Sequence, residues 1–367
     1  MFLAFARLIE PLTYWRDVVF LWERVRYRRV TLLMSAAQLD RRAFLRASFG
    51  LLAGSRFPLG GQAAAGLSGW PPSMARQLTA AMRSGRASLP EVHAELQSYV
   101  RAFKATLPGR DSGAFRDPSE DEQQAFIGAL SRALTADPDG AAADLDPLGY
   151  DVLWVIDSSR NGSRHLALRE RQPYERCWGL FLVNESPVVA GLGPIIVEAP
   201  HPVFDTNSAE LAIEAYRELA ADAFLMAGAH RYANGPDSEI SDMARNPHSI
   251  LQRVHERLAT ASHHVLNYHG FAPTNHPGYP NVVLSNGSDA PHTELFTLKE
   301  QLEARAESAG VYDGVSFGEL SGTVNPQGRH TRALGGRFYH MEHVTAIRTD
   351  PERRTRCVEA MVATLRP

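Results

Sequence analysis

The feature that most constrains the fold is a regular alternation of apolar strand-like runs and amphipathic helix-like stretches after Gly149. Strands are predicted at 152–156, 177–183, 194–199, 223–227, 264–268, 281–285 and 337–342, and helices at 209–219, 247–259, 298–309 and 353–365. This alternation is typical of βαβ units, in which helices cover a sheet. The sequence therefore predicts an α/β fold: a three-layer, mostly parallel or mixed sheet with helices on both faces, plus an N-terminal helical segment.

The chain is long enough to hold more than this sheet. It has 367 residues, of which 44% are hydrophobic, and that suffices for one large α/β domain with a helical accessory piece. We predict three regions: 1–65 as an N-terminal extension with a targeting signal, 66–148 as a helical accessory region, and 149–367 as the α/β domain. In the second region the pattern predicts helices at 74–78, 92–103 and 120–134 and a loop at 137–146, which together form either an accessory domain or a packing layer.

A targeting signal is predicted from the segment Asp40-Arg41-Arg42-Ala43-Phe44-Leu45-Arg46, which resembles the twin-arginine export signal. A mildly apolar run (47–55) and the small residues of 62–65 follow it, as signal peptidase requires. We therefore expect export through the twin-arginine route to the periplasm, with Met34 as a possible start; the alternative is an ordinary basic amphipathic helix. Neither this run nor 18–22 is long enough to span a bilayer, so we expect no stable membrane span in the mature form.

Charge and cysteine content narrow the possible partners. Lys and Arg total 38 against 41 Asp and Glu, for a net charge of −3. A nucleic-acid-binding protein usually shows a basic excess or stripe, so nucleic acid is not an expected partner. The two cysteines, Cys177 and Cys357, lie far apart and form no C-x-x-C motif; they are either one long-range disulfide or two buried thiols.

Histidines gather in one part of the chain and at one kind of position. Of 14 histidines, all but His93 and His165 lie between positions 201 and 343. Three predicted strands each run into a histidine: His201, His230 and His269. Because ligands of open, mostly parallel sheets bind at the carboxyl ends of strands, we expect these rings to approach one site.

Spacing points to a metal as the occupant of that site. His201 and Asp205 lie four residues apart in Pro200-His201-Pro202-Val203-Phe204-Asp205, and catalytic zinc takes three protein ligands while leaving a position for water. We predict one divalent metal, zinc, held by His201, Asp205 and His269, with Gly270 letting the backbone turn after His269. The alternative for Asp205 is that it caps the helix that begins near Ser208.

Nearby basic residues are candidates for binding substrate. Arg231 and Arg245 could hold a carboxylate, because a guanidinium matches that group with two hydrogen bonds. His230 could contact substrate, orient a ligand or be a fourth ligand, and we favour the first two roles. For each arginine the alternative is a plain surface salt bridge.

The late strand carries a candidate general base. In Arg337-Phe338-Tyr339-His340-Met341-Glu342 the side chains alternate, so His340 and Glu342 share a face. A carboxylate beside a metal-bound water can accept its proton and pass it to the leaving group. The alternative is a half-buried Glu342 paired with Arg348 or Arg337.

These segments also resemble a known group of enzymes. Ile195-Ile196-Val197-Glu198-Ala199-Pro200-His201, Tyr268-His269-Gly270-Phe271 and His340-Met341-Glu342-His343 with Arg348 are similar to the N-formylglutamate amidohydrolases, which are related to the zinc carboxypeptidase-like hydrolases. The resemblance covers about residues 150–350, and Pro202-Val203 stands where that group usually has Ser-Gly. It implies zinc bound by His201 and His269, Glu342 as the base, and cleavage of an amide bond next to a carboxylate. The implied substrate is a small acidic or N-acylated amino acid or peptide.

Two other functions are compatible with parts of the sequence. Gly314-Val315-Ser316-Phe317-Gly318 matches the G-x-S-x-G motif of serine hydrolases, which requires a strand before the serine and a helix after it. Glycines before this segment and a poor helix sequence after it disfavour that function. The second is a non-catalytic periplasmic protein that binds a metal or ligand and has no need of Glu342.

Overall fold

The computed structural model describes residues 89–135, 137–187 and 193–366. The predicted export signal and the predicted helix at 74–78 lie outside these residues, so both stay predictions, as does the division of the chain into three regions. None of the helices in the described part of the chain is long and apolar enough to cross a membrane.

Ten strands form one mixed sheet in the order β1-β2-β3-β4-β6-β5-β7-β10-β8-β9. At its centre β6, β5, β7 and β10 run parallel to one another, while β2 to β4 form an antiparallel block beside them. The strands are β1 Glu91–Ala94, β2 Tyr150–Asp157, β3 Ser163–Glu170, β4 Leu180–Asn184, β5 Ile195–Ala199, β6 Ala223–Met226, β7 His264–Phe271, β8 Val282–Ser285, β9 Ala309–Val311 and β10 Arg337–Val344.

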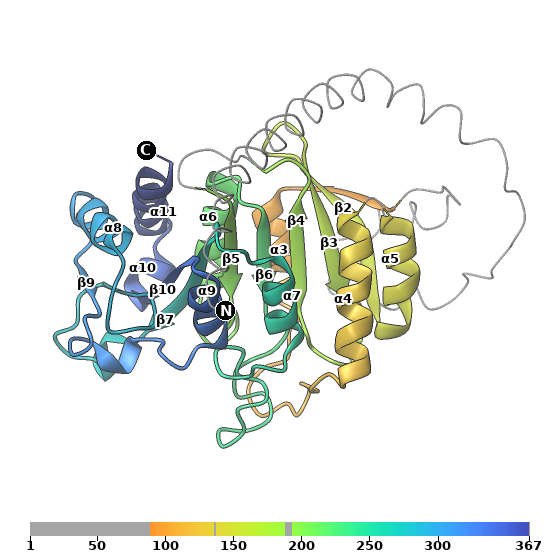
Figure 1. Ribbon diagram of the computed structural model, residues 1–367, viewed down its shortest axis with the longest axis horizontal. Helices are drawn as coiled ribbons and strands as arrows, with labels where there is room; N and C mark the ends of the chain where they lie inside the picture. The colour runs from red at the N-terminus through yellow and green to blue at the C-terminus, as the bar shows by residue number, and fades with distance from the viewer. Residues whose placement is uncertain (1–88, 136, 188–192, 367) are drawn as a thin grey trace, which may run out of the picture. The chain divides into compact units, whose positions relative to one another are not determined.

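Helices cover both faces of this sheet, which confirms the predicted fold class. One buried cluster joins the strands to α3, α6, α8 and α11, and a second joins their opposite faces to α4, α5 and α7. In Figure 1, α4 and α5 lie over the β2 and β3 end of the sheet. The helices are α3 Leu96–Lys104, α4 Glu120–Leu134, α5 Pro138–Leu145, α6 Ser208–Glu218, α7 Ile250–Leu258, α8 Thr293–Glu303, α9 Pro326–Leu334, α10 Thr345–Thr349 and α11 Pro351–Leu365.

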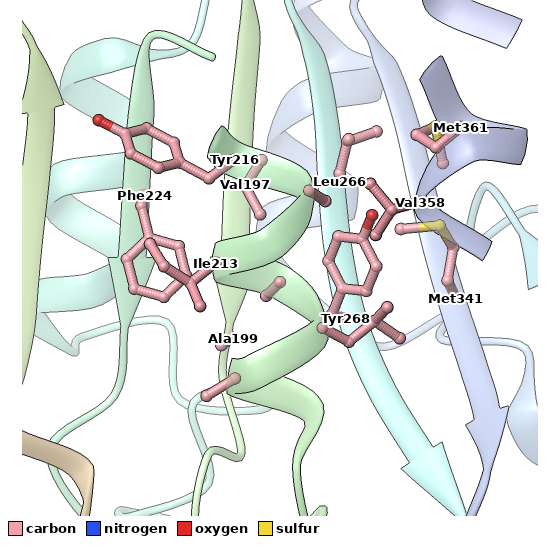
Figure 2. Packing of buried hydrophobic residues seen from close by; sticks show 14 of the residues in the cluster. Val197, Ala199, Ile213, Tyr216, Phe224, Leu266, Tyr268, Met341, Val358 and Met361 are labelled. Carbon is pink, nitrogen blue, oxygen red and sulfur yellow. The ribbon is translucent and has the colours of Figure 1, made fainter. Parts of the chain in front are cut away.

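The parallel centre of the sheet is held by apolar packing against α6 and α11. Figure 2 shows Ile213 of α6 and Val358 of α11 packing near Val197, Leu266 and other apolar side chains of the strands. All of these side chains are at most 2% exposed. Burial of apolar surface contributes roughly 25 cal/mol per Å², so this layer fixes the positions of the central strands.

Several elements differ from the sequence prediction: β9, α9 and α10 were not predicted, and three further differences have a clear physical reason. Residues 91–94 form edge strand β1 rather than the start of a helix, and their alternating burial follows period 2. Residues 138–145 form helix α5 rather than a loop, because Asp137 caps the backbone N–H of Gly140 and Pro138 occupies the first turn. Strand β3 was not predicted, because its charged residues hide the apolar pattern.

Those charged residues are buried with partners. The Arg169 guanidinium is 2% exposed and donates to Asp151. The Glu170 carboxylate accepts backbone N–H groups of Arg176, Cys177 and Trp178 at 2.9, 2.8 and 2.6 Å. A buried charge is tolerated when it is paired in this way. Strand β3 can therefore lie in the interior even though its sequence contains charged residues.

Both cysteines are buried and form no disulfide. Of the two alternatives, the structure therefore has the unpaired thiols. Burial raises the pKa of the Cys177 thiol to about 12, and that of Cys357 likewise to about 12, so neither thiol is a reactive nucleophile at neutral pH.

Candidate metal centre

The loop after β5 brings His201 and Asp205 together. The backbone N–H of Asp205 donates to the carbonyl of His201 at 2.9 Å, closing a single turn that places both side chains on one side. Helix α6 begins at Ser208 after Asn207, whose φ of 60° marks the change of direction. The alternative that Asp205 caps this helix is not observed, because the N-cap position is Asn207 and it has no side-chain cap.

His269 completes a triangle with these two residues. His201 Nδ1 lies 3.1 Å from His269 Nδ1, and Asp205 Oδ2 lies 3.4 Å from the former and 3.3 Å from the latter. All three side chains are at most 3% exposed. The structure thus brings together the three residues that the sequence predicted as metal ligands, and they form a group able to hold a metal ion.

The size of the triangle fits zinc. Ligand atoms about 2.0–2.1 Å from zinc in tetrahedral geometry lie about 3.3 Å from one another. The three observed separations of 3.1 to 3.4 Å bracket this value. Two imidazole nitrogens and one carboxylate oxygen are also the donor types that zinc prefers, so the residues present fit this metal.

A carboxylate orients the His201 ring from behind. His201 Nε2 lies 2.7 Å from Asp242 Oδ1, and Arg231 donates to the other oxygen of Asp242. Since a carboxylate only accepts hydrogen bonds, Nε2 carries a hydrogen toward Asp242, and Nδ1 is the atom that faces Asp205. Burial alone lowers the pKa of His201, but Asp242 and Asp205 outweigh it and raise that pKa to about 9.

His269 lies inside a strand rather than at its end. Strand β7 continues to Phe271, so the ring projects from the sheet face and not from a loop. Its Nε2 lies 2.6 Å from the side-chain oxygen of Asn267, two residues earlier on the same face. Burial, aided by His340 nearby, lowers the pKa of His269 to about 4.

Strand β10 places Glu342 beside the triangle. Glu342 is the register partner of His269 on the neighbouring parallel strand, and it is 9% exposed. Its Oε1 lies 3.4 Å from Nε2 of His340, so it is not paired with Arg348 or Arg337. Burial raises the pKa of Glu342, but the hydrogen bond from His340 and the charges of the two nearby histidines prevail, and the net direction is downward.

The guanidinium of Arg348 joins three segments around the site. It donates to the carbonyl of Thr206, to that of Phe271 at 3.2 Å and to that of His343 at 3.0 Å. These carbonyls belong to the loop after β5, the end of β7 and the end of β10. Through these hydrogen bonds the buried Arg348 holds together the three backbone segments that carry the site. Its partners are carbonyl groups and not a carboxylate.

The predicted substrate-binding residues lie in the loop after β6. The side chain of Arg245 is 47% exposed and pairs with Glu239 at 2.7 Å. Arg231 donates to Asp242, while its Nε has no hydrogen-bond partner among the described residues. The His230 ring accepts the backbone N–H of Tyr232 at 3.0 Å. Each of the three stays a prediction as a substrate contact.

An aromatic and cationic rim adjoins these residues. Phe204, next to Asp205, is 39% exposed, and its ring lies 5.3 Å from that of His230. The guanidinium of Arg231 lies 5.3 Å from the ring of Phe204, and that of Arg110 lies 5.0 Å from the ring of Tyr232. Backbone hydrogen bonds tie the loop of Arg110 to residues 230–233, so this loop also borders the site.

The serine segment does not form a nucleophile site in the described structure. Strand β9 ends at Val311, and a short 3₁₀ turn at Gly318–Leu320 follows instead of an α-helix. The hydroxyl of Ser316 donates to a carboxylate oxygen of Asp313 at 3.3 Å in an exposed loop, and it has no histidine partner among the described residues. The context that a G-x-S-x-G nucleophile requires is therefore missing from the described residues around it.

Sequence reasoning missed the residues that orient the histidines. Asn267 and Glu198 had a detectable signal: Asn267 is two positions from His269, and Glu198 is a charged residue inside an apolar strand. A period-2 pattern places Asn267 on the face of His269. No sequence signal pointed to Asp242, because it reaches His201 from a loop whose path the sequence pattern does not determine.

Fold and site together define an α/β protein with a candidate divalent-metal centre at the middle of a mixed sheet. A scan of the sequence against protein-family models finds no match, and no curated protein matches it. Among solved structures, the chain is similar to YNDL in a zinc-free form, with 14% identity and a TM-score of 0.35, covering 50% of this chain and 88% of that one.

Two further solved structures show a comparable likeness. One is a bacteriophage poly-gamma-glutamate hydrolase, with 11% identity and a TM-score of 0.31, covering 48% of this chain and 85% of that one. The other is an aspartoacylase family protein from Mesorhizobium loti, with 11% identity and a TM-score of 0.36, covering 59% and 70%. These values describe a distant and partial likeness, and what those proteins bind or cleave is a statement about them alone.

Proposed function

We propose that the chain is a zinc-dependent hydrolase of an amide or peptide-type C–N bond next to a carboxylate. The observation that carries the proposal is the buried triangle of His201, Asp205 and His269 with Glu342 in register beside it. When bound, zinc supplies Lewis-acid polarisation of a carbonyl and lowers the pKa of water. The resemblance of the sequence to the N-formylglutamate amidohydrolases agrees with this chemistry.

The proton-transfer role falls to Glu342. Glu342 lies on the strand next to His269 and is slightly more exposed than the three candidate ligands, so it is the site residue most open to water and substrate. The lowered pKa keeps it in the accepting form at neutral pH. Glu342 can take a proton from the attacking water and return it to the leaving nitrogen.

Substrate selection falls to the loop after β6. The side chains of Arg245 and Arg231 are 47% and 22% exposed, and a guanidinium binds a carboxylate well. Together with His230 they would hold the carboxylate that lies next to the scissile bond. The expected substrate is thus a small N-acylated amino acid or acidic peptide.

The test compares wild type with Glu342→Gln and with Glu359→Gln, a matched change at a side chain that is 60% exposed and pairs only loosely with Arg305. Bound zinc is measured in each protein, followed by hydrolysis of N-formyl and N-acetyl amino acids and small peptides. We expect about one zinc in all three, with turnover lowered by roughly 10²–10⁴-fold in Glu342→Gln alone.

Two outcomes would contradict the proposal. If wild type binds no metal, the proposed zinc site is wrong. Bound metal without turnover in any form would favour the alternative, a non-catalytic binding protein that uses the same ligands and has no need of Glu342.

A further inference from the structure

We propose that Asn267 is a positioning residue that fixes the tautomer of His269 and so leaves its Nδ1 free to bind the metal. The inference rests on the metal site proposed above and extends it to a buried polar chain. That chain runs from His269 through Asn267 to Glu198 and His255 on one side and to Asn325 on the other.

The first anchor of Asn267 is Glu198. The Nδ2 group of Asn267 donates to Glu198 Oε2 at 2.8 Å, and His255 Nδ1 lies 2.8 Å from the other oxygen, Oε1. All three side chains are 0% exposed. A carboxylate offers only acceptors, so the amide nitrogen of Asn267 must be the atom that faces Glu198.

The second anchor of Asn267 is Asn325, whose own orientation is fixed by a hydrogen bond from a backbone N–H. Asn325 caps α9 by accepting the N–H of Gly328 on its Oδ1 at 3.0 Å. A backbone N–H can only donate, so the orientation of the Asn325 amide is fixed and its Nδ2 points away from the helix. That Nδ2 lies 3.2 Å from Asn267 Oδ1. Both anchors therefore require the same orientation of Asn267, with the nitrogen to Glu198 and the oxygen to Asn325.

The fixed orientation of Asn267 determines which nitrogen of the candidate ligand His269 carries a hydrogen. Asn267 Oδ1 lies 2.6 Å from His269 Nε2, and since the oxygen accepts, Nε2 must carry a hydrogen. A neutral imidazole with its hydrogen on Nε2 has its lone pair on Nδ1. That is the atom 3.3 Å from Asp205 Oδ2. Asp242 imposes the same arrangement on His201, so both rings present Nδ1 to one point.

The first test needs no substitution. Wild-type protein is stripped of metal, labelled with ¹⁵N-histidine and examined by NMR, with the His269 signals assigned by their loss in His269→Gln. We expect the neutral ring of His269 to carry its hydrogen on Nε2 in a single tautomer. A hydrogen on Nδ1, or a mixture of the two forms, would overturn the proposal.

The second test changes the chain of contacts. Asn267→Leu removes the acceptor, and we expect a mixture of tautomers and zinc binding weakened by about 10–100-fold. The double exchange of Glu198→Gln with Asn267→Asp keeps every contact but reverses the donor. The amide introduced at position 198 donates to the carboxylate introduced at position 267, and its oxygen still accepts from His255. We expect this double variant to restore the Nε2–H tautomer and zinc affinity.

The outcomes separate a positioning role from a merely structural one. Zinc affinity within twofold of wild type in folded Asn267→Leu, with a single Nε2–H tautomer, would overturn the proposal. If that variant does not fold, the tautomer in wild type decides. A wild type that carries the hydrogen on Nε2 but binds no zinc would contradict the proposed function and leave the role of Asn267 in orienting the ring intact.

Discussion

Gly270 follows a candidate ligand directly, and its missing side chain leaves room for Arg348. The sequence suggested that this glycine allows a sharp turn, but β7 continues through it and its φ is not among the positive values of the chain. A Cβ at position 270 would fall on the guanidinium group of Arg348. The need for glycine here is therefore one of space and not of backbone conformation.

Gly270→Ala should displace Arg348 and loosen the backbone that carries the site. Overpacking against a buried side chain such as Arg348 costs about 1–3 kcal/mol, so we expect a loss of that size in the free energy of unfolding and weaker zinc binding. Urea denaturation measures the first and zinc titration the second. The matched control is Gly128→Ala in α4, where a Cβ meets nothing within 4 Å; it should gain about 1 kcal/mol. Equal stability of the two variants would contradict the role given to Arg348.

Residue by residue, the sequence predicted the side chains that come together at the candidate site better than the side chains that support them. His201, Asp205, His269 and Glu342 could be chosen because histidines and carboxylates in or just after the strands of an α/β sheet are a known chemical pattern. The supporting contacts join positions far apart in the chain, such as His201 with Asp242. Such contacts depend on how loops cross the sheet, which periodicity does not determine.

At the scale of elements, β3 is linked to α6 by a buried histidine. His165 Nδ1 lies 2.8 Å from the hydroxyl of Tyr216, and its Nε2 lies 3.1 Å from Ser163 Oγ. The ring is 3% exposed, and burial lowers the pKa of His165 to about 4 from its usual value of 6.5. Folding therefore favours the neutral ring.

This link makes stability depend on pH in a defined window. Between pH 6.5 and about 4 the unfolded chain binds the proton and the folded chain does not, so the contribution of His165 falls as the pH falls through this window. The loss totals about 3 kcal/mol below pH 4. Urea unfolding of wild type and His165→Gln at pH 7, 5.5 and 4 should show the two stabilities converging toward acid. A constant difference across this range would contradict the prediction.

Elements with clean periodicity were predicted well, and those with buried charge were not. Helix α4 has the bounds that the sequence predicted, because Ser119 and Glu122 form a capping box at its start. Strand β3 was missed because its charged side chains find partners only in the folded chain. Strand β1 was predicted as helix, since four residues give too short a pattern to distinguish period 2 from 3.6.

For the molecule as a whole, the candidate ligands tie together the middle of the sheet. His201 and Asp205 follow β5, His269 lies in β7 and Glu342 in β10, and these three strands are adjacent in the sheet order. The alternation of strands and helices was enough to predict the fold class, but not this order. Which strand pairs with which depends on long-range packing that no local pattern encodes.

A cation that joins the loop after β5 to strand β7 should stabilise the whole domain. Zinc at 100 times its Kd should raise the free energy of unfolding by about 2.7 kcal/mol if it binds the folded chain alone. Thermal unfolding with and without zinc should therefore show a higher Tm in wild type and in Asp139→Asn, an exposed control. Asp205→Asn should show no rise. An equal zinc-dependent rise in Asp205→Asn would place the binding elsewhere.

The near-complete burial of the three candidate ligands has a consequence for the speed of metal exchange. No ligand side chain is more than 3% exposed, so a chelator can approach the ion only at its open coordination position and cannot displace the three ligands while the native contacts hold. Release would have to wait for the surrounding loops to open. Such a centre would keep its ion through long dialysis and fill slowly when the apoprotein meets zinc, even if its affinity were only moderate.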